Sequence, residues 1–120
     1  VEAKDSALLR STDGGYKWET VNKDINVNGR PFYYADIRVD PERPDRLYRL
    51  ATFADVSDDG GKTFSTLIGL QHLHPDNHAL WINPRNGAHM INGNDGGIGI
   101  SYDRGESWRF VTNLPLAQFY

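Results

Sequence analysis

Histidine and aspartate alternate in one stretch of the chain, where His72, His74, Asp76 and His78 occupy every second position. In an extended backbone, side chains two residues apart point to the same side, so these four groups would face one way. Imidazole and carboxylate groups are ligands for zinc and other transition metals. The spacing therefore allows a metal or catalytic site at His74, Asp76 and His78. Pro75 interrupts regular extension, and the alternative is a structural polar cluster whose groups only bond the backbone or a neighbouring sheet.

The run Asn94-Asp95-Gly96-Gly97 brings a second set of polar side chains into consideration. Such a run is first of all typical of a tight hairpin turn, because glycine adopts the backbone conformations that these turns need. Asp95 could in addition join His78 if both residues lie on the same edge of a sheet. Asn94 and Asp95 are therefore turn residues and, as the alternative, candidate ligand-binding residues.

Arg30, Tyr33 and Tyr34 form the third candidate group. An arginine beside exposed tyrosines is suited to binding carboxylates and sugar rings. The same residue types also line the central channels of repeat folds, and this structural role is the alternative.

A repeated octet organises the elements that must position these groups. Its pattern is Ser, any residue, Asp, any residue, Gly, two variable residues and a large aromatic. The serines of its three copies lie 46 and 44 residues apart, a period that suits the four-stranded blade of a β-propeller. Asp followed by Gly is typical of a tight turn, so we expect Asp13, Asp59 and Asp103 to be turn acceptors and the octets to be hairpins. The copies are Ser11, Asp13, Gly15 and Trp18; Ser57, Asp59, Gly61 and Phe64; and Ser101, Asp103, Gly105 and Trp108.

The strands around these octets predict an all-β fold of four-stranded antiparallel propeller blades. We expect a partial propeller domain over 1–120, with the outer half of a blade at 1–22, complete blades at 31–68 and 76–112, and the start of a further blade at 113–120. The fourth strands are expected over 63–68 and 107–112. In such blades the octets lie at the edge opposite the turns that carry the three candidate groups.

Together these residues resemble the Asp-box (BNR) repeat β-propellers, a family that includes sialidases, xyloglucanase-type glycoside hydrolases and Vps10/sortilin ectodomains. The similarity is greatest to bacterial Vps10-like proteins described as BNR-repeat glycosyl hydrolases. It rests on the third octet and on His78-Ala79-Leu80-Trp81-Ile82-Asn83-Pro84, Gly93-Asn94-Asp95-Gly96-Gly97 and Ala117-Gln118-Phe119-Tyr120. The resemblance implies a secreted, periplasmic or cell-surface protein. It also implies a scaffold that binds a protein, peptide or glycan ligand, or alternatively part of a glycoside hydrolase.

Composition narrows the range of partners. The 13 basic and 16 acidic side chains give no basic field of the kind that binds nucleic acid. No apolar run approaches the roughly 20 residues of a membrane span, and the chain has no cysteine. Two complete blades cannot close a ring, so we expect the remaining blades to come from a longer parent chain or from further copies. We predict no cofactor, and we expect His89 and the charged residues of 42–46 to be solvated without a role.

Overall fold

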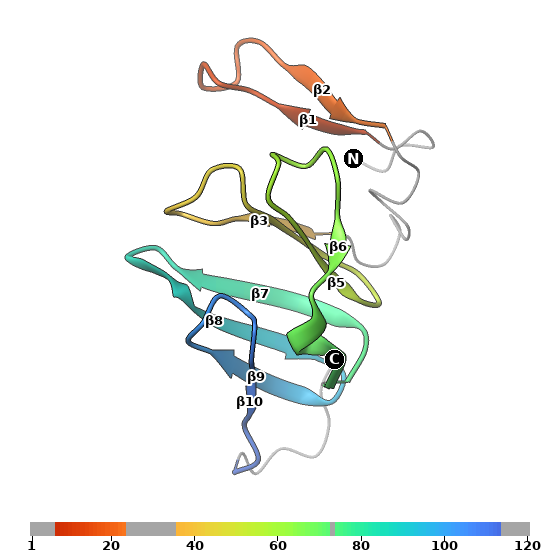
Figure 1. The fold of residues 1–120 in the computed structure, drawn as a ribbon, viewed down its shortest axis with the longest axis vertical. Coiled ribbons are helices and arrows are strands. Elements are labelled where there is room, and N and C mark those ends of the chain that lie inside the picture. Colours follow the sequence, from red (N-terminus) through yellow and green to blue (C-terminus); the bar gives the residue numbers. More distant parts are fainter. Residues whose placement is uncertain (1–6, 24–35, 73, 114–120) are drawn as a thin grey trace.

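The computed structural model describes residues 7–23, 36–72 and 74–113 of the 120-residue chain. These residues form an all-β fold of one two-stranded sheet and two four-stranded sheets, stacked along the long axis of the molecule (Figure 1). No α-helix occurs in these three segments. The predicted candidates Arg30, Tyr33 and Tyr34, and the predicted blade start at 113–120 apart from its first residue, lie outside the described residues.

All three sheets are antiparallel. The first sheet contains β1 (Leu8–Arg10) and β2 (Glu19–Asn22). The second contains β3 (Asp36–Val39), β4 (Leu47–Leu50), β5 (Ala54–Ser57) and β6 (Ser65–Thr66), and a 3-10 helix, η2 (Ile68–His72), follows it. The third contains β7 (Asn77–Asn83), β8 (Asn86–Asn94), β9 (Gly97–Ser101) and β10 (Arg109–Phe110).

The second and third sheets repeat one another in order and in register. Each is a simple meander in which consecutive strands pair, β3-β4-β5-β6 and β7-β8-β9-β10. Leu47 pairs with Ser57 in the second sheet, and Met90 pairs with Ser101 in the third, so the first residues of the second and third octets have the same kind of partner. The prediction of antiparallel four-stranded sheets is therefore confirmed.

The fourth strands are much shorter than predicted, with only two paired residues each at β6 and β10. A strand lies within each predicted segment, but the bounds 63–68 and 107–112 are too wide, in part because the octet takes up the first two residues of each. After β6 the chain turns into η2, where Ile68 is exposed and Leu70 is buried. The connection thus supplies a core residue instead of extending the sheet.

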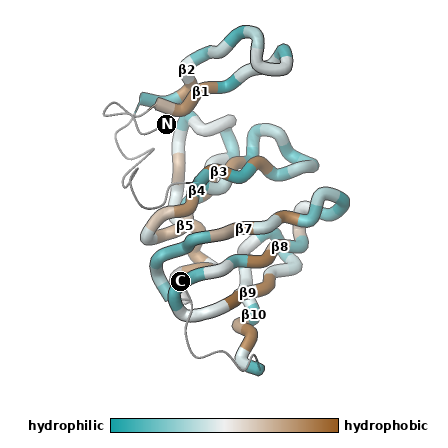
Figure 2. Tube along the Cα trace, turned by 180° about the vertical axis from the view of Figure 1, so that it is seen from behind, coloured by the Kyte–Doolittle hydropathy of each residue, from teal (hydrophilic) through white to brown (hydrophobic). Residues whose placement is uncertain are grey.

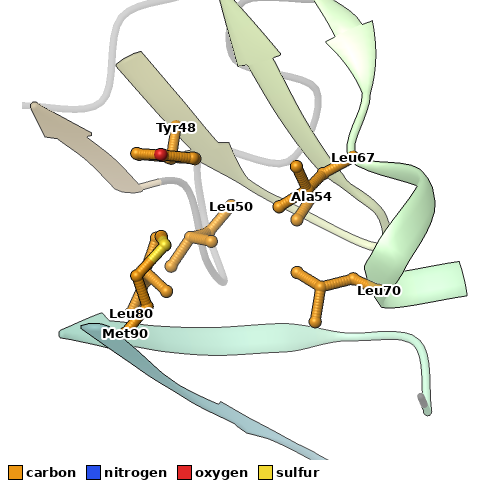
Figure 3. Packing of buried hydrophobic residues seen from close by; sticks show 7 residues of the cluster. All are labelled: Tyr48, Leu50, Ala54, Leu67, Leu70, Leu80 and Met90. Carbon is orange, nitrogen blue, oxygen red and sulfur yellow. The ribbon is translucent and has the colours of Figure 1, made fainter. Parts of the chain in front are cut away.

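Alternation of side chains along the strands builds the core between the second and third sheets. Tyr48 and Leu50 of the second sheet lie over Leu80 and Met90 of the third, and Ala54 lies with Leu67 above Leu70 (Figure 3). Tyr48 and Met90 have no exposed surface. Burying a large apolar side chain contributes about 1.5–3 kcal/mol, so this cluster is a principal stabilising contact between the two sheets.

The octets, which we call Asp boxes, share one hydrogen-bond pattern. In each, the serine hydroxyl donates to the aspartate carboxylate at 2.7–2.8 Å and accepts the N–H of the box glycine at 2.8–2.9 Å. The carboxylate also accepts the backbone N–H four residues after itself at 2.9 Å. The box glycines have φ of 85–97°, a conformation that favours glycine. These bonds account for the serine, aspartate and glycine of the pattern by turn geometry alone.

The box hydrogen bonds also lower the pKa of each aspartate. In Asp59 the hydroxyl and then the N–H of Thr63 are the largest causes, and Ser107 acts in the same way on Asp103. In Asp13 the N–H of Lys17 and the hydroxyl of Ser11 lower the pKa. Hydrogen bonds to the charged form favour ionisation, so all three turns hold aspartate as carboxylate.

Arg104 joins the third Asp box to the second sheet. Its Nε donates to Asp40 at 2.9 Å, and its NH2 contacts Glu42, whose carboxylate also accepts the N–H of Gly87 at 3.0 Å. The Asp40 side chain is completely buried. Burial raises the pKa of Asp40, but the N–H of Glu42 and the guanidinium of Arg104 outweigh it, so the net pKa is lowered.

The expectation that the charged residues of 42–46 are solvated without a role is therefore wrong for Glu42. It is also wrong for Arg46, which is largely buried and binds Asp58 at 2.6 Å, whereas Asp45 is solvated in an exposed ion pair with Arg10 of the first sheet at 3.1 Å. These residues lie in the β3–β4 turn, at the same edge of the stack as the Asp boxes. The contacts of Glu42 and Asp45 with other sheets, and that of Arg46 with the second Asp box, were not visible in the local sequence pattern.

Candidate functional site

The edge opposite the Asp boxes is where three connections meet: the β4–β5 turn, the segment before β7, and the β8–β9 turn (Figure 1). We call this region, residues 51–53, 74–78 and 94–97, the histidine edge. The N–H of Asp76 donates to the carbonyl of Thr52 at 2.9 Å, and the N–H of Asn77 donates to that of Ala51 at 3.1 Å. Gly96 lies directly against His74, because a Cβ on that glycine would be 2.5 Å from the Cβ of His74. Backbone contacts thus bring together most of the residues that the sequence singled out.

His74, Asp76 and His78 do not have the extended arrangement on which a shared metal shell depends. Asp76 has a φ of 63°, in the left-handed region, so the backbone turns between the two histidines. The Nδ1 atom of His74 lies 2.9 Å from the carbonyl oxygen of Pro75. In the described part of the chain, no three His, Cys, Asp or Glu side chains come together as a group that could hold a metal ion. The side chain of His72 lies outside the described residues.

His78, near the start of β7, and Asp95, in the β8–β9 turn, form a pair at one end of the third sheet. Their Nε2 and Oδ1 atoms are 2.6 Å apart, and both side chains remain partly exposed. Adjacent strands position them, since Asn77 pairs with Asn94 at this end of β7 and β8. A carboxylate bonded to one imidazole nitrogen fixes the orientation of the ring. This pair can therefore present both a carboxylate oxygen and an oriented imidazole to a ligand.

Asn94 belongs to a buried row of amides beneath this pair. Its Nδ2 donates to Asn92 at 2.9 Å, and its Oδ1 accepts the N–H of Gly96 at 2.9 Å, which closes the hairpin turn. Asn92 has no exposed surface and donates to the carbonyl of Ala79 at 3.4 Å. Asn94 is thus part of the turn scaffold, and it holds Asp95 at the tip. Sequence reasoning missed Asn92, which looks like any polar residue of an alternating strand.

A small cavity of about 80 Å³ opens beside the same residues, between the second and third sheets. Asn77 lines it and is 3% exposed, with Nδ2 donating to the carbonyls of Thr52 at 3.3 Å and Ala51 at 3.5 Å. The sequence reasoning did not single out Asn77. A signal for it was its place directly after the Pro75-Asp76 turn, where the chain enters β7. The cavity and the His78–Asp95 pair together make the histidine edge the candidate site.

His89, expected to be solvated, instead belongs to an aromatic group on the outer face of the third sheet. Its ring stacks on Tyr102 at a centroid distance of 4.9 Å and meets the edge of Trp81 at 5.4 Å. His89 lies two residues before Ile91 on β8, so strand alternation could have placed its side chain on the same outward face as that of Ile91. The group is remote from the histidine edge because Tyr102 lies in the third Asp box.

No protein-family model matches the chain, and no curated protein matches it significantly. Within the described residues, no helix has the length and apolar character needed to cross a membrane. The histidine edge offers hydrogen-bond acceptors, one imidazole–carboxylate pair and an apolar-walled cavity, a combination suited to binding a ligand.

Proposed function

We propose that the chain is part of an Asp-box β-propeller, similar to the Vps10/sortilin-like proteins, and that it binds a protein, peptide or glycan ligand at the histidine edge. The observation that carries this proposal is the division of polar groups between two edges. The polar groups of the Asp boxes are used in turns at one edge, whereas His78, Asp95 and the cavity lie at the other. Ligands of repeat folds bind where turns vary from repeat to repeat.

The repeated register supports the identification of the second and third sheets as consecutive blades. Across the second sheet, Arg38, Tyr48 and Val56 stand in one row, and this row faces the third sheet. Arg38 donates through Nε to the carbonyl of Leu80 at 3.2 Å. Each sheet of a propeller covers the next in this way.

The corresponding row of the third sheet supports a further blade. It consists of Trp81, Ile91 and Ile100, which are paired in register but face outward. Ile91, at the centre of this row, is only partly buried, whereas Tyr48, its counterpart in the second sheet, is fully buried. Apolar stretches of β8 and β9 lie at this end of the stack (Figure 2). We propose that another four-stranded sheet, from a longer parent chain or a further copy, covers this face, and that the protein is exported.

The histidine edge differs between the repeats in the manner expected of a binding surface. The β8–β9 turn carries Asn94 and Asp95, whereas the equivalent β4–β5 turn is Ala51-Thr52-Phe53. Asp76 keeps a left-handed φ without being glycine, and such positions cluster at functional sites. The repeat itself requires neither the acidic β8–β9 turn nor the left-handed backbone at Asp76.

The test is a screen of the protein on glycan and peptide arrays, followed by Asp95→Ala in the protein that binds. We expect Asp95→Ala to weaken binding at least tenfold, and the control Asp58→Ala, an aspartate at the box edge that also forms an ion pair but is more exposed, to leave it unchanged. Asp76→Asn, which tolerates the left-handed backbone, is a second variant at the histidine edge. Unchanged binding in Asp95→Ala and Asp76→Asn, or steady turnover of aryl glycosides by the protein, would contradict the scaffold proposal.

A further inference from the structure

An open groove of about 500 Å³ lies between the first and second sheets. Among the described residues its walls are mostly apolar: Leu8 and Leu9 come from β1, and Ile37, Val39 and Leu47 come from the second sheet. Val39 is 51% exposed and Leu9 is 50% exposed. A groove of this size has room for more than one large side chain.

Three residues of the groove have register equivalents in the third sheet, because both sheets pair in the same way relative to the serine of their Asp box. The equivalents are Leu80 for Ile37, Ile82 for Val39 and Met90 for Leu47. In the third sheet these positions belong to the core, where Leu80 is 3% exposed and Met90 has no exposed surface. The surface that lines the groove is thus the one that is buried in the next sheet.

In the third sheet, Tyr48 and Leu50 of β4 cover this surface (Figure 3). β4 pairs with β5, so that Tyr48 lies beside Val56 and Leu50 lies beside Ala54. The equivalent of β5 in the first sheet is β1, since Ala54 and Leu8 each stand three residues before a box serine. In the described part of the chain, β1 pairs with β2 alone. Among these residues, the groove therefore has no equivalent of β4 and of its two large side chains.

The outer edge of β1 can accept a further strand through backbone hydrogen bonds. In the register of β4 on β5, one side chain of an antiparallel strand would lie beside Arg10 and another, two residues later, beside Leu8. Side chains two residues apart point to the same face, so both would enter the groove. Among the described lining residues only Arg10 is charged, and it binds Asp45 at 3.1 Å, so apolar side chains fit the groove best.

We propose that this groove binds an extended segment of a partner chain. The segment adds to β1 as an antiparallel strand and inserts two large apolar side chains, two residues apart, over Ile37 and Val39. The inference goes beyond the proposed function, because the groove shares no described lining residue with the histidine edge. It follows from the interface between the second and third sheets, whose pattern the groove repeats.

The test uses a peptide with the sequence of residues 46–51, acetyl-Arg-Leu-Tyr-Arg-Leu-Ala-amide, which contains β4. Binding is followed by the methyl NMR signals of Leu8, Ile37 and Val39 in the protein, and we expect saturable shifts. A control peptide has the same composition in the order Leu-Tyr-Arg-Leu-Arg-Ala, so that arginine replaces both inserted apolar side chains. Burying one such side chain corresponds to roughly tenfold or more in affinity, so the control should bind at least tenfold more weakly.

Methylation of backbone nitrogens separates strand pairing from non-specific apolar binding. Alternate N–H groups of a strand point to opposite edges, so one peptide is N-methylated at the positions of Leu47 and Arg49 and another at those of Tyr48 and Leu50. Because one of the two sets faces β1, one methylated peptide should bind at least tenfold more weakly than the other. Equal affinities of these two peptides overturn the inference.

Variants of the protein locate the bound peptide. Val39→Lys places a charge in the groove and should weaken binding at least tenfold, whereas Ile68→Lys, at an exposed aliphatic residue outside the groove, should leave binding unchanged. Asp95→Ala should also leave peptide binding unchanged, even where it weakens binding of the array ligand, so the two proposals fail separately. The peptide comparisons use the natural protein and decide the matter if Val39→Lys does not fold.

Three results overturn the inference. The first is the absence of saturable shifts, and the second is equal binding of the control peptide. The third is a set of NMR cross-peaks that show another segment of the same chain over Ile37 and Val39 before the peptide is added, because the groove would then be filled from within the chain.

Discussion

Substitution of Arg104 should reveal how the third Asp box helps to hold neighbouring sheets together. The residue occupies the box position that is glycine in the other two boxes, and all three have positive φ: 77° at Gly14, 76° at Gly60 and 58° at Arg104. A side chain in this region costs roughly 1–2 kcal/mol. We infer that the third box tolerates this strain because its arginine reaches Asp40 and Glu42. Replacing Arg104 by alanine removes the contact and keeps the strain, whereas glycine removes both.

The magnitudes follow from the burial of the partner. Removing one partner of a buried ion pair typically costs 3–5 kcal/mol. Asp40 is fully buried and keeps the N–H groups of Glu42 and Arg43, while Arg104 itself is 19% exposed, so the cost should be lower. We expect Arg104→Ala to lower the free energy of unfolding by about 2–3 kcal/mol. The loss in Arg104→Gly should be smaller by about 1 kcal/mol, because glycine also relieves the backbone strain.

Equilibrium unfolding in urea, followed by tryptophan fluorescence, measures these differences. Arg10→Ala is the matched control, because Arg10 makes the equivalent contact with Asp45 between exposed side chains, and it should cost less than about 1 kcal/mol. In an Asp40→Asn background, Oδ1 still accepts both backbone N–H groups, so removal of Arg104 should have a smaller effect. Equal unfolding free energies for the alanine and glycine variants, both within about 0.5 kcal/mol of the natural protein, would refute the reasoning.

Two further predictions concern the Asp boxes. Ser57→Ala should lower the free energy of unfolding by about 1–3 kcal/mol in the same assay, because it leaves the buried N–H of Gly61 without its acceptor. Ser11→Ala, which removes the equivalent but exposed bond from Gly15, should cost less than about 1 kcal/mol. Since folding lowers the pKa of Asp59 and Asp103, their stabilisation is complete above the unfolded pKa, near 3.8, and is lost as the pH falls through their folded values. Thermal unfolding should therefore shift to lower temperature below about pH 4, and less so in Asp59→Asn; an unchanged profile in that variant would contradict this cause.

Local patterns in the sequence were enough to predict the sheets. The three boxes and the strand alternation around them indicated antiparallel four-stranded sheets, because turn chemistry and period-two burial are properties of short segments. The ends of β6 and η2 were not predictable in this way. Leu70 enters the core only because the third sheet lies where its side chain points, which is a long-range contact.

The candidate site was predicted only in part, because its geometry also depends on long-range contacts. The joining of Asp95 to His78 followed from placing both residues at one edge, and the structure brings them to 2.6 Å. The extended arrangement of His74, Asp76 and His78 was wrong, because the left-handed backbone at Asp76 is not encoded by the spacing of side chains. The cavity beside Asn77 depends on two sheets and a 3-10 helix at once, so no single stretch of sequence indicated it.

The exposure of Trp81 tests most directly whether these sheets are consecutive blades of a larger ring. The variant Trp18→Phe, Trp108→Phe leaves Trp81 as the sole tryptophan, and both changes keep the box aromatic, since the second box has Phe64 at that position. In the assembled protein, the account predicts blue-shifted emission from Trp81 that resists quenching by acrylamide, because another sheet covers its face. Red-shifted, readily quenched emission, as expected of a side chain that stays 46% exposed, would contradict it.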